Sequence, residues 1–252
     1  MRDIRRTWKG KAVLAVAAPA LAVLAVAAIG GRGRAAGPPA EDYTVQAGPS
    51  GTIQGRVLYV GKPVRPVTMV NTEDPAYCGS TMVSYPIRVE KGGVVDAVVW
   101  IDHITHGKAF AFPKAVVNQK KCAFTPSVVL MAPGRLKVEN SDPVAHDVQI
   151  FARLNPSSNH VMPKGSKPLE LTMIRPETVT VACDIHKDMT SYVVIAQNPY
   201  YALTRSGGVF ELTGVPPGTY QIKVWQKKLG TRTERVTVRA GKTSNVTFKL
   251  GA

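Results

Sequence analysis

Short apolar stretches of strand length, separated by Pro- and Gly-containing turns, constrain the fold of this 252-residue chain most strongly. Residues 94–101, 146–150, 169–173 and 179–183 alternate in the period of two that places every second side chain on one face of a strand. Beyond residue 30, no long stretch shows the apolar periodicity of a helix. We therefore predict an all-β protein.

The remaining apolar stretches predict further strands. Residues 55–60 and 191–196 have strand length, and residues 206–250 contain four more stretches around a Pro-Gly and an Ala-Gly turn. Residues 127–131 and 136–138 flank Pro133-Gly134, which predicts a hairpin.

The N-terminal residues are predicted to direct export. Five Lys and Arg residues in the first eleven positions precede an Ala/Val/Leu run that begins at residue 12 and ends near residue 30. Residues 1–37 are therefore expected to be a signal peptide, or an N-terminal membrane anchor, because the run is long enough to span a bilayer. Residues 38–50 form a predicted linker, and the protein is expected in the periplasm or cell envelope.

The chain is basic, with a formal net charge of +15. Residues 1–34 hold seven Lys or Arg and one Asp, so much of the excess lies beyond them. Such a surface would attract acidic partners, or it is a well-solvated surface that only keeps the protein soluble, and the sequence leaves both interpretations open. Nucleic acid is not an expected partner, because basic and aromatic residues do not interleave.

The chain has three cysteines, so at least one of them cannot form a disulfide within the chain. Cys78 and Cys122 can form a disulfide, which leaves Cys183 as a candidate metal ligand. A disulfide between Cys183 and either of the others would remove that ligand, and the sequence leaves the pairing open.

Cys183, His186 and Met189 are spaced three residues apart, and His146 begins another apolar stretch 37 residues before Cys183. One thiolate, two imidazoles and one thioether are the ligands of a mononuclear blue-copper site. Zinc is the main rival metal, since Cys, two His and water can bind it. Met189 favours copper, because zinc gains little from a thioether.

The segments 140–148 and 183–189 resemble those of the cupredoxin family, which includes plastocyanin, azurin and amicyanin. The specific match spans about residues 135–195, and the Cys-x2-His-x2-Met spacing is similar to the short ligand loop of amicyanin. The resemblance implies a Greek-key β-sandwich with one type 1 copper. It also implies that His146, Cys183 and His186 are equatorial ligands and Met189 is the axial ligand.

One residue departs from the family pattern. The position after the first histidine is often Asn in cupredoxins, where it braces the ligand loop, and here it is Asp147. An ionised Asp can still accept backbone N–H bonds, but its charge favours Cu(II) and lowers the reduction potential. Asp184 and Asp188 are expected to act in the same direction.

The C-terminal residues, with Gly207-Gly-Val-Phe-Glu-Leu and Val215-Pro-Pro-Gly-Thr-Tyr, resemble the carboxypeptidase regulatory-like, transthyretin-like β-sandwich. The expected organisation is a cupredoxin-like domain at 51–198 and this second, small β-sandwich at 199–252. About 50 residues are few for an independent core. The strand at 51–60 is therefore considered as a missing part of it, which would nest one module inside the other.

Two histidines in Trp100-Ile-Asp-His-Ile-Thr-His, His103 and His106, could form a weak surface metal site, but exposed strand-end residues are the preferred interpretation. His160 is expected in a polar loop.

The preferred function is a periplasmic electron carrier whose partner is an acidic redox protein such as a c-type cytochrome or oxidase. The alternatives are a non-redox binding or scaffold protein and a copper-delivery protein of the cell envelope. No arrangement typical of an enzyme is found, and membrane association would depend on residues 12–30.

Overall fold

The computed structural model describes residues 43–251, and strands make up most of this range. The regions predicted to direct export, to anchor the chain and to begin the linker lie outside the described residues. Among those described, no helix has the length and apolar character needed to cross a membrane. The all-β prediction is confirmed, with one helix of four residues, α1 (Pro75–Cys78), and one 3-10 turn, η1 (Ser206–Gly208), in the described range.

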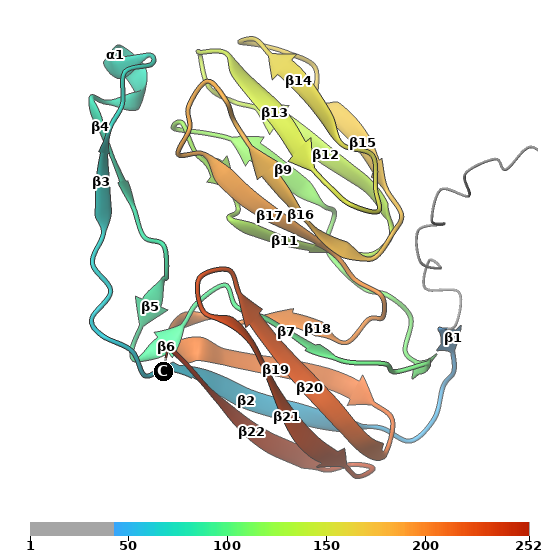
Figure 1. The fold of residues 1–252 in the computed structure, drawn as a ribbon. Helices are drawn as coiled ribbons and strands as arrows, with labels where there is room; N and C mark the ends of the chain where they lie inside the picture. Colours follow the sequence, from blue (N-terminus) through green and yellow to red (C-terminus); the bar gives the residue numbers. More distant parts are fainter. Residues whose placement is uncertain (1–42, 252) are drawn as a thin grey trace, which may run out of the picture. The chain divides into compact units, whose positions relative to one another are not determined.

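One β-sandwich is built from strands between residues 116 and 195, coloured green to orange in Figure 1. Its sheets have the orders β10-β9-β12-β15 and β11-β17-β16-β13-β14. Side chains of both sheets share one core cluster, in which Leu136 and Val138 meet Val148, Ile150 and Val181. The strands are β9 (Val116–Gln119), β10 (Phe124–Thr125), β11 (Val128–Met131), β12 (Gly134–Asn140), β13 (His146–Phe151), β14 (Ser158–Met162), β15 (Leu169–Met173), β16 (Glu177–Ala182) and β17 (Thr190–Ile195).

The hairpin predicted around Pro133-Gly134 is wrong. Strand β11 pairs in parallel with β17, whereas β12 pairs with β15 and β9 in the opposite sheet. The short connection crosses from one sheet to the other, so the apolar faces of β11 and β12 meet across the core rather than side by side. A Pro-Gly turn is compatible with either arrangement, and only pairing with distant strands decides between them.

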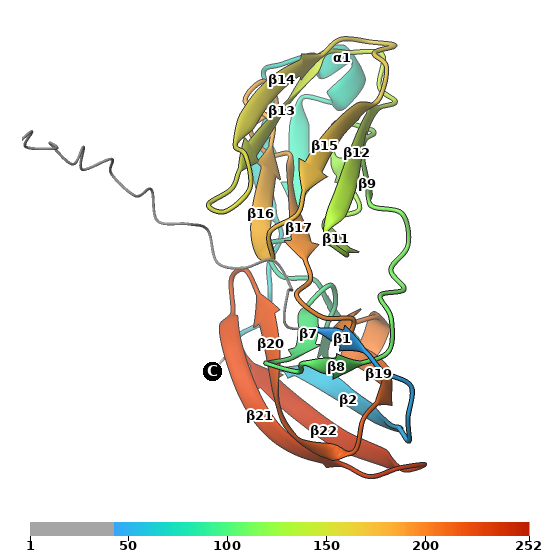
Figure 2. The ribbon, with the colours of Figure 1, turned by 90° about the vertical axis from the view of Figure 1, so that its right-hand side faces the viewer.

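The second β-sandwich combines strands from both ends of the described chain. Its sheets have the orders β18-β7-β20-β21 and β19-β2-β6-β5, with β22 also paired to β2. Figure 2 shows the blue strand β2 among the red C-terminal strands. The strands are β2 (Gly51–Tyr59), β5 (Val89–Glu90), β6 (Gly93–Val94), β7 (Val98–Ile101), β18 (Tyr201–Leu203), β19 (Val209–Val215), β20 (Gly218–Gln226), β21 (Gly230–Val238) and β22 (Thr243–Leu250).

These pairings bear on the predicted boundaries at 51–198 and 199–252. Strands β2, β6 and β7 precede residue 116, yet they share a core with β19 to β22, in which Ile53 and Val99 meet Ile222 and Phe248. The boundary near residue 51 therefore does not separate the two cores. The observed pairing is the nested arrangement, with the 116–195 sandwich inserted between strands of the other.

A third group of strands lies outside both sandwiches. Strands β3 (Val67–Val70) and β4 (Thr81–Ser84) pair only with each other and flank α1. Strand β1 (Thr44–Val45) pairs in parallel with β8 (His106–Gly107). We call residues 67–84 the cap, because its side chains contact the site described next.

Candidate metal centre

Three of the four predicted ligands come together at one end of the 116–195 sandwich. His146 is the first residue of β13, and Cys183 directly follows β16. His186 lies in the loop that leads to β17. Their ligand atoms lie within 4.8 Å of one another, and the Nδ1 atoms of His146 and His186 are 3.0 Å apart.

All four predicted ligands are buried. The exposed fractions are 0% for His146, 2% for Cys183, 2% for His186 and 1% for Met189. The side chain of Met189 belongs to the same core cluster as Cys183, which places the thioether in the interior of the sandwich. The site is therefore dry, and a ligand set held in the core keeps its geometry without help from solvent.

The loop 183–189 is closed by its own backbone. The Cys183 N–H donates to the Met189 carbonyl at 3.3 Å, and the Met189 N–H donates to the His186 carbonyl at 3.0 Å. The N–H of His186 points at the Cys183 sulfur at 3.3 Å. These bonds set the positions of the thiol and the imidazole relative to one another.

Asp147 ties the ligand loop to β13. Its carboxylate accepts the N–H of Asp184 at 2.6 Å, and its own N–H points at the Cys183 sulfur at 3.5 Å. Asp147 thus braces the loop through backbone bonds, as an Asn at this position could. It does so while placing a buried carboxylate next to the thiol.

Burial governs the protonation of Cys183 and His186 in the metal-free site. Burial raises the pKa of the Cys183 thiol to about 11, because the thiolate is poorly solvated there. Burial and the neighbouring His146 lower the pKa of His186, so its imidazole is neutral at pH 7. The neutral imidazole of His186 can bind a metal, and a bound cation would offset the cost of the thiolate. The donor set therefore fits a copper ion.

Asp142 is a functional residue that sequence reasoning missed. Its carboxylate lies 2.9 Å from Nε2 of His146 and accepts the N–H groups of Lys121 and Cys122 and the hydroxyl of Tyr77. Burial alone would raise the pKa of Asp142, but these hydrogen bonds outweigh burial and lower it. The available signal was its place four residues before His146 in Asn140-Ser-Asp-Pro.

The carboxylate of Asp142 also holds an unusual turn. Lys121 and Cys122 have φ values of 55° and 54°, in the left-handed region that side chains other than glycine rarely adopt. Their successive N–H groups converge on one carboxylate, which compensates for the strained backbone. Asp142 therefore joins the first histidine, the Cys122 turn and the cap.

The predicted disulfide between Cys78 and Cys122 is confirmed, and Cys183 is the free cysteine, buried in the core. The disulfide attaches α1 to the 116–195 sandwich. The Cys78 sulfur lies 3.4 Å from Nε2 of His186, and the Asp74 carboxylate lies at the same distance from that nitrogen. The Nε2 edge of His186 would serve for electron exit if it were near the surface, but it is covered by the cap.

The other histidines take no part in this cluster. His103 and His106 are exposed, as expected, and neither belongs to a group of three metal-ligating side chains in the described range. The prediction of a loop for His160 is wrong, because this residue lies in β14 and pairs with Val148.

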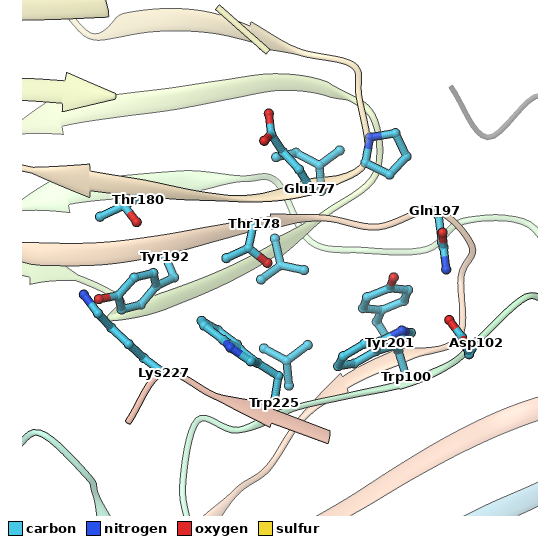
Figure 3. Close-up of a pocket in the computed structure, with 14 residues that line it drawn as sticks. Trp100, Asp102, Glu177, Thr178, Thr180, Tyr192, Gln197, Tyr201, Trp225 and Lys227 are labelled. Atoms are coloured by element: carbon cyan, nitrogen blue, oxygen red, sulfur yellow. The ribbon is translucent and has the colours of Figure 1, made fainter. Parts of the chain in front are cut away.

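A separate cavity of about 530 Å³ lies away from the metal cluster. Figure 3 shows its aromatic side chains, Trp100, Tyr201, Tyr192 and Trp225, with the carboxylates of Asp102 and Glu177 at its margin. Its lining contains no histidine or cysteine. It therefore offers no soft metal ligands, and the candidate chemistry stays at the cluster of His146, Cys183 and His186.

Comparison with known proteins finds both predicted resemblances. Residues 189–251 match the carboxypeptidase regulatory-like domain. The match covers β17 to β22 and includes Met189, and it represents a quarter of the chain. Among curated protein sequences, none matches this chain.

The structural neighbours include cupredoxins and a copper-containing enzyme. A purple cupredoxin from Nitrosopumilus maritimus is 14% identical, with 32% of this chain and 99% of that chain covered and a TM-score of 0.29. A reduced-state mutant of amicyanin is 20% identical, with 39% and 98% covered and a TM-score of 0.30. A copper-containing nitrite reductase from Thermus scotoductus is 19% identical, with 38% and 25% covered and a TM-score of 0.29.

Proposed function

We propose that this chain is an exported electron carrier with one type 1 copper, bound by His146, Cys183 and His186 and by Met189 as a weak axial ligand. The observation that carries the proposal is the buried pair of Nδ1 atoms, 3.0 Å apart, beside the free thiol of Cys183. Two imidazoles and one thiolate form the trigonal set of a blue-copper centre. Copper bound there would cycle between Cu(II) and Cu(I).

The protein residues contribute rigidity and exclusion of water. Cys183 and His146 are fixed by strand ends, and the loop that carries His186 is closed by backbone bonds and braced by Asp147. Such a site changes little between two oxidation states of a metal. The buried thioether of Met189 is neutral, so it adds no charge to the site in either oxidation state of the metal.

The route to a partner is expected to pass through the cap. Because Nε2 of His186 faces Cys78 and Asp74, an electron that leaves through this imidazole meets the cap before solvent. The basic chain favours an acidic partner such as a c-type cytochrome or oxidase. We place the protein in the periplasm or cell envelope, with membrane association through residues 12–30 if they remain attached, and we assign it no enzymatic reaction.

Copper delivery is the second candidate function. The observation that favours it is the covered edge of His186, since a carrier gains from an imidazole that a partner can reach. A delivery protein would release copper to an acceptor, whereas a carrier would retain copper through many cycles.

The distinguishing experiment is redox cycling of the copper-loaded full-length chain. We expect one reversible one-electron wave in voltammetry, rapid re-oxidation by a c-type cytochrome in stopped flow, and unchanged copper content afterwards. Cys183→Ser should lose the wave. Loss of copper to a chelator within a few cycles, or a copper protein that cannot be re-oxidised, would contradict the carrier function.

A further inference from the structure

A second set of metal-binding atoms lies on the far side of His186. The sulfurs of Cys78 and Cys122 and a ring nitrogen of His186 lie within 4.8 Å of one another, with Nε2 at 3.4 Å from the Cys78 sulfur. His186 thus presents Nδ1 to His146 and Nε2 to the disulfide. A third group, made of Cys122, Asp142 and His146, adjoins both.

The redox state of the two cysteines decides whether this set can bind a metal. The sulfurs of a disulfide carry no charge and are poor ligands, whereas thiolates are strong, soft ligands. Transfer of two electrons and two protons from a dithiol reductant cleaves the S–S bond, gives two thiols and converts the reductant to its own disulfide. Loss of the two thiol protons then leaves two thiolates beside the imidazole of His186.

We propose that Cys78 and Cys122, once reduced, form with Nε2 of His186 a second site that binds one Cu(I). Binding displaces the two thiol protons, and copper undergoes no oxidation or reduction. Two thiolates and one imidazole suit Cu(I), which soft ligands select. A structural zinc site needs a fourth protein ligand, which the two sulfurs and Nε2 of His186 do not supply. The cap carboxylate that faces Nε2, Asp74, has a side chain that is 43% exposed.

The surroundings of the disulfide allow a reductant and a metal ion to reach it. No residue of α1 is buried, and Cys78 is only partly buried, while Cys122 is fully covered. Strands β3 and β4 pair with each other and with no other described strand, so the cap can move without breaking a sheet. The hydroxyl of Tyr77 donates a hydrogen bond to Asp142, which is a second contact between the cap and the sandwich besides the disulfide.

The second site lies one imidazole ring away from the first. In the reduced protein it receives Cu(I) from solution at the partly exposed Cys78, next to a histidine that also faces Cys183 and His146. In the oxidised protein the same two sulfurs close the cap over His186. A neutral imidazole offers a lone pair at one nitrogen only, so Nε2 of His186 is free to bind Cu(I) where Nδ1 holds no metal. The second site is therefore tested with the first site empty.

The test uses the full-length Cys183→Ser variant, which lacks the thiolate of the first site. Metal-free protein is prepared in its oxidised form and after reduction with a phosphine that is then removed without oxygen. Cu(I) is titrated in competition with a colorimetric Cu(I) chelator. We expect no bound Cu(I) in the oxidised form and one equivalent after reduction, with two sulfurs and one nitrogen around copper in X-ray absorption.

Three controls separate ligation from general effects of reduction. Alkylation of the two thiols in the reduced Cys183→Ser variant should abolish uptake without a mutation that could prevent folding. The triple Ser variant at positions 78, 122 and 183, checked by circular dichroism, should also bind none. His186→Ala in the Cys183→Ser background should retain the two sulfurs and lose the nitrogen.

Three outcomes would overturn the second site. They are no stoichiometric Cu(I) in the reduced Cys183→Ser variant, retained binding after alkylation, and tighter binding of zinc than of Cu(I) in a parallel titration. Failure of the electron-carrier function has a different signature. It would appear as absence of copper in the oxidised wild-type chain, whatever the reduced variant does.

Discussion

Asp142 is the residue through which the elements of the site depend on one another. It faces His146 with one oxygen and accepts hydrogen bonds from the cap and from the turn at Cys122. A carboxylate behind a metal-binding histidine orients the ring and makes the other nitrogen more basic. In this chain, that other nitrogen is the Nδ1 that faces His186.

Asp142→Asn should therefore weaken copper binding without removing a ligand. Loss of the charge behind His146 is expected to lower Cu(II) affinity about 10–100-fold, measured by competition with a chelator of known affinity. Glu139→Gln is the matched control, because it removes one nearby carboxylate on β12 that pairs with Lys137 instead. Equal affinities of the two variants would show that Asp142 does not support His146.

At the scale of single residues, the sequence predicted the ligands better than their supports. Cys183, His186 and Met189 are close in sequence, and His146 lies on an alternating strand, so local patterns suffice to find them. The bond between Asp142 and Tyr77 and the contact between Cys78 and His186 depend on distant segments meeting, because the residues lie 65 and 108 positions apart. No local pattern encodes such a contact.

At the scale of elements, Glu177 fixes the loop between β13 and β14. At the start of β16, its carboxylate accepts the N–H groups of Arg153, Leu154 and Asn155 and the side-chain amide of Asn155. Burial alone would raise the pKa of Glu177, but these four bonds outweigh it and lower the pKa. The folded state therefore holds the carboxylate in its charged form.

Glu177→Gln should destabilise the protein by about 1–2 kcal/mol at pH 7, since bonds to a charged acceptor are lost. The pKa of Glu177 is lower in the folded than in the unfolded state. Its carboxylate therefore contributes its full stabilisation above the ordinary Glu pKa of about 4.3, and the stabilisation is lost as pH falls through the pKa of the folded state. Urea unfolding at pH 7 and near pH 3 should show that the difference in unfolding free energy between variant and wild type becomes smaller in acid. Glu170→Gln, which removes an exposed ion pair with Arg135, is the control. A difference in unfolding free energy between Glu177→Gln and wild type that does not change with pH would contradict the role of Glu177.

The elements themselves were largely predictable, but their partners were not. The alternation at 146–150 and 179–183 identified β13 and β16, since a half-buried strand must alternate. The stretch 127–138 was interpreted as a hairpin because the Pro-Gly turn is a local signal. Parallel pairing of β11 with β17 joins strands more than 60 positions apart, which no turn signal reports.

At the scale of the whole molecule, the second β-sandwich depends on residues from before the first one. Strand β2 pairs with β19 and with β22, and β7 lies between β18 and β20. The sequence suggested this dependence only through the length of the C-terminal segment, because about 50 residues are few for an independent core. It left nested and sequential orders open.

A fragment of residues 199–252 should therefore not fold by itself. Without β2 and β7, both of its sheets lose an interior strand and the core loses Ile53, Val57 and Val99. We expect narrow amide dispersion in NMR and no cooperative thermal transition. A chain that joins residues 43–108 to 198–252 through a flexible linker should restore both, and a cooperatively folding 199–252 fragment would refute the nested architecture.

The most direct test of the central assignment is titration of the full-length chain with Cu(II), followed by visible absorption and electron paramagnetic resonance. We predict an intense thiolate-to-copper band that saturates at one equivalent and is absent in Cys183→Ser. A thiol count before titration establishes that Cys183 is free, as in the structure. A colourless protein that binds no stoichiometric copper despite a free Cys183 thiol would contradict the account.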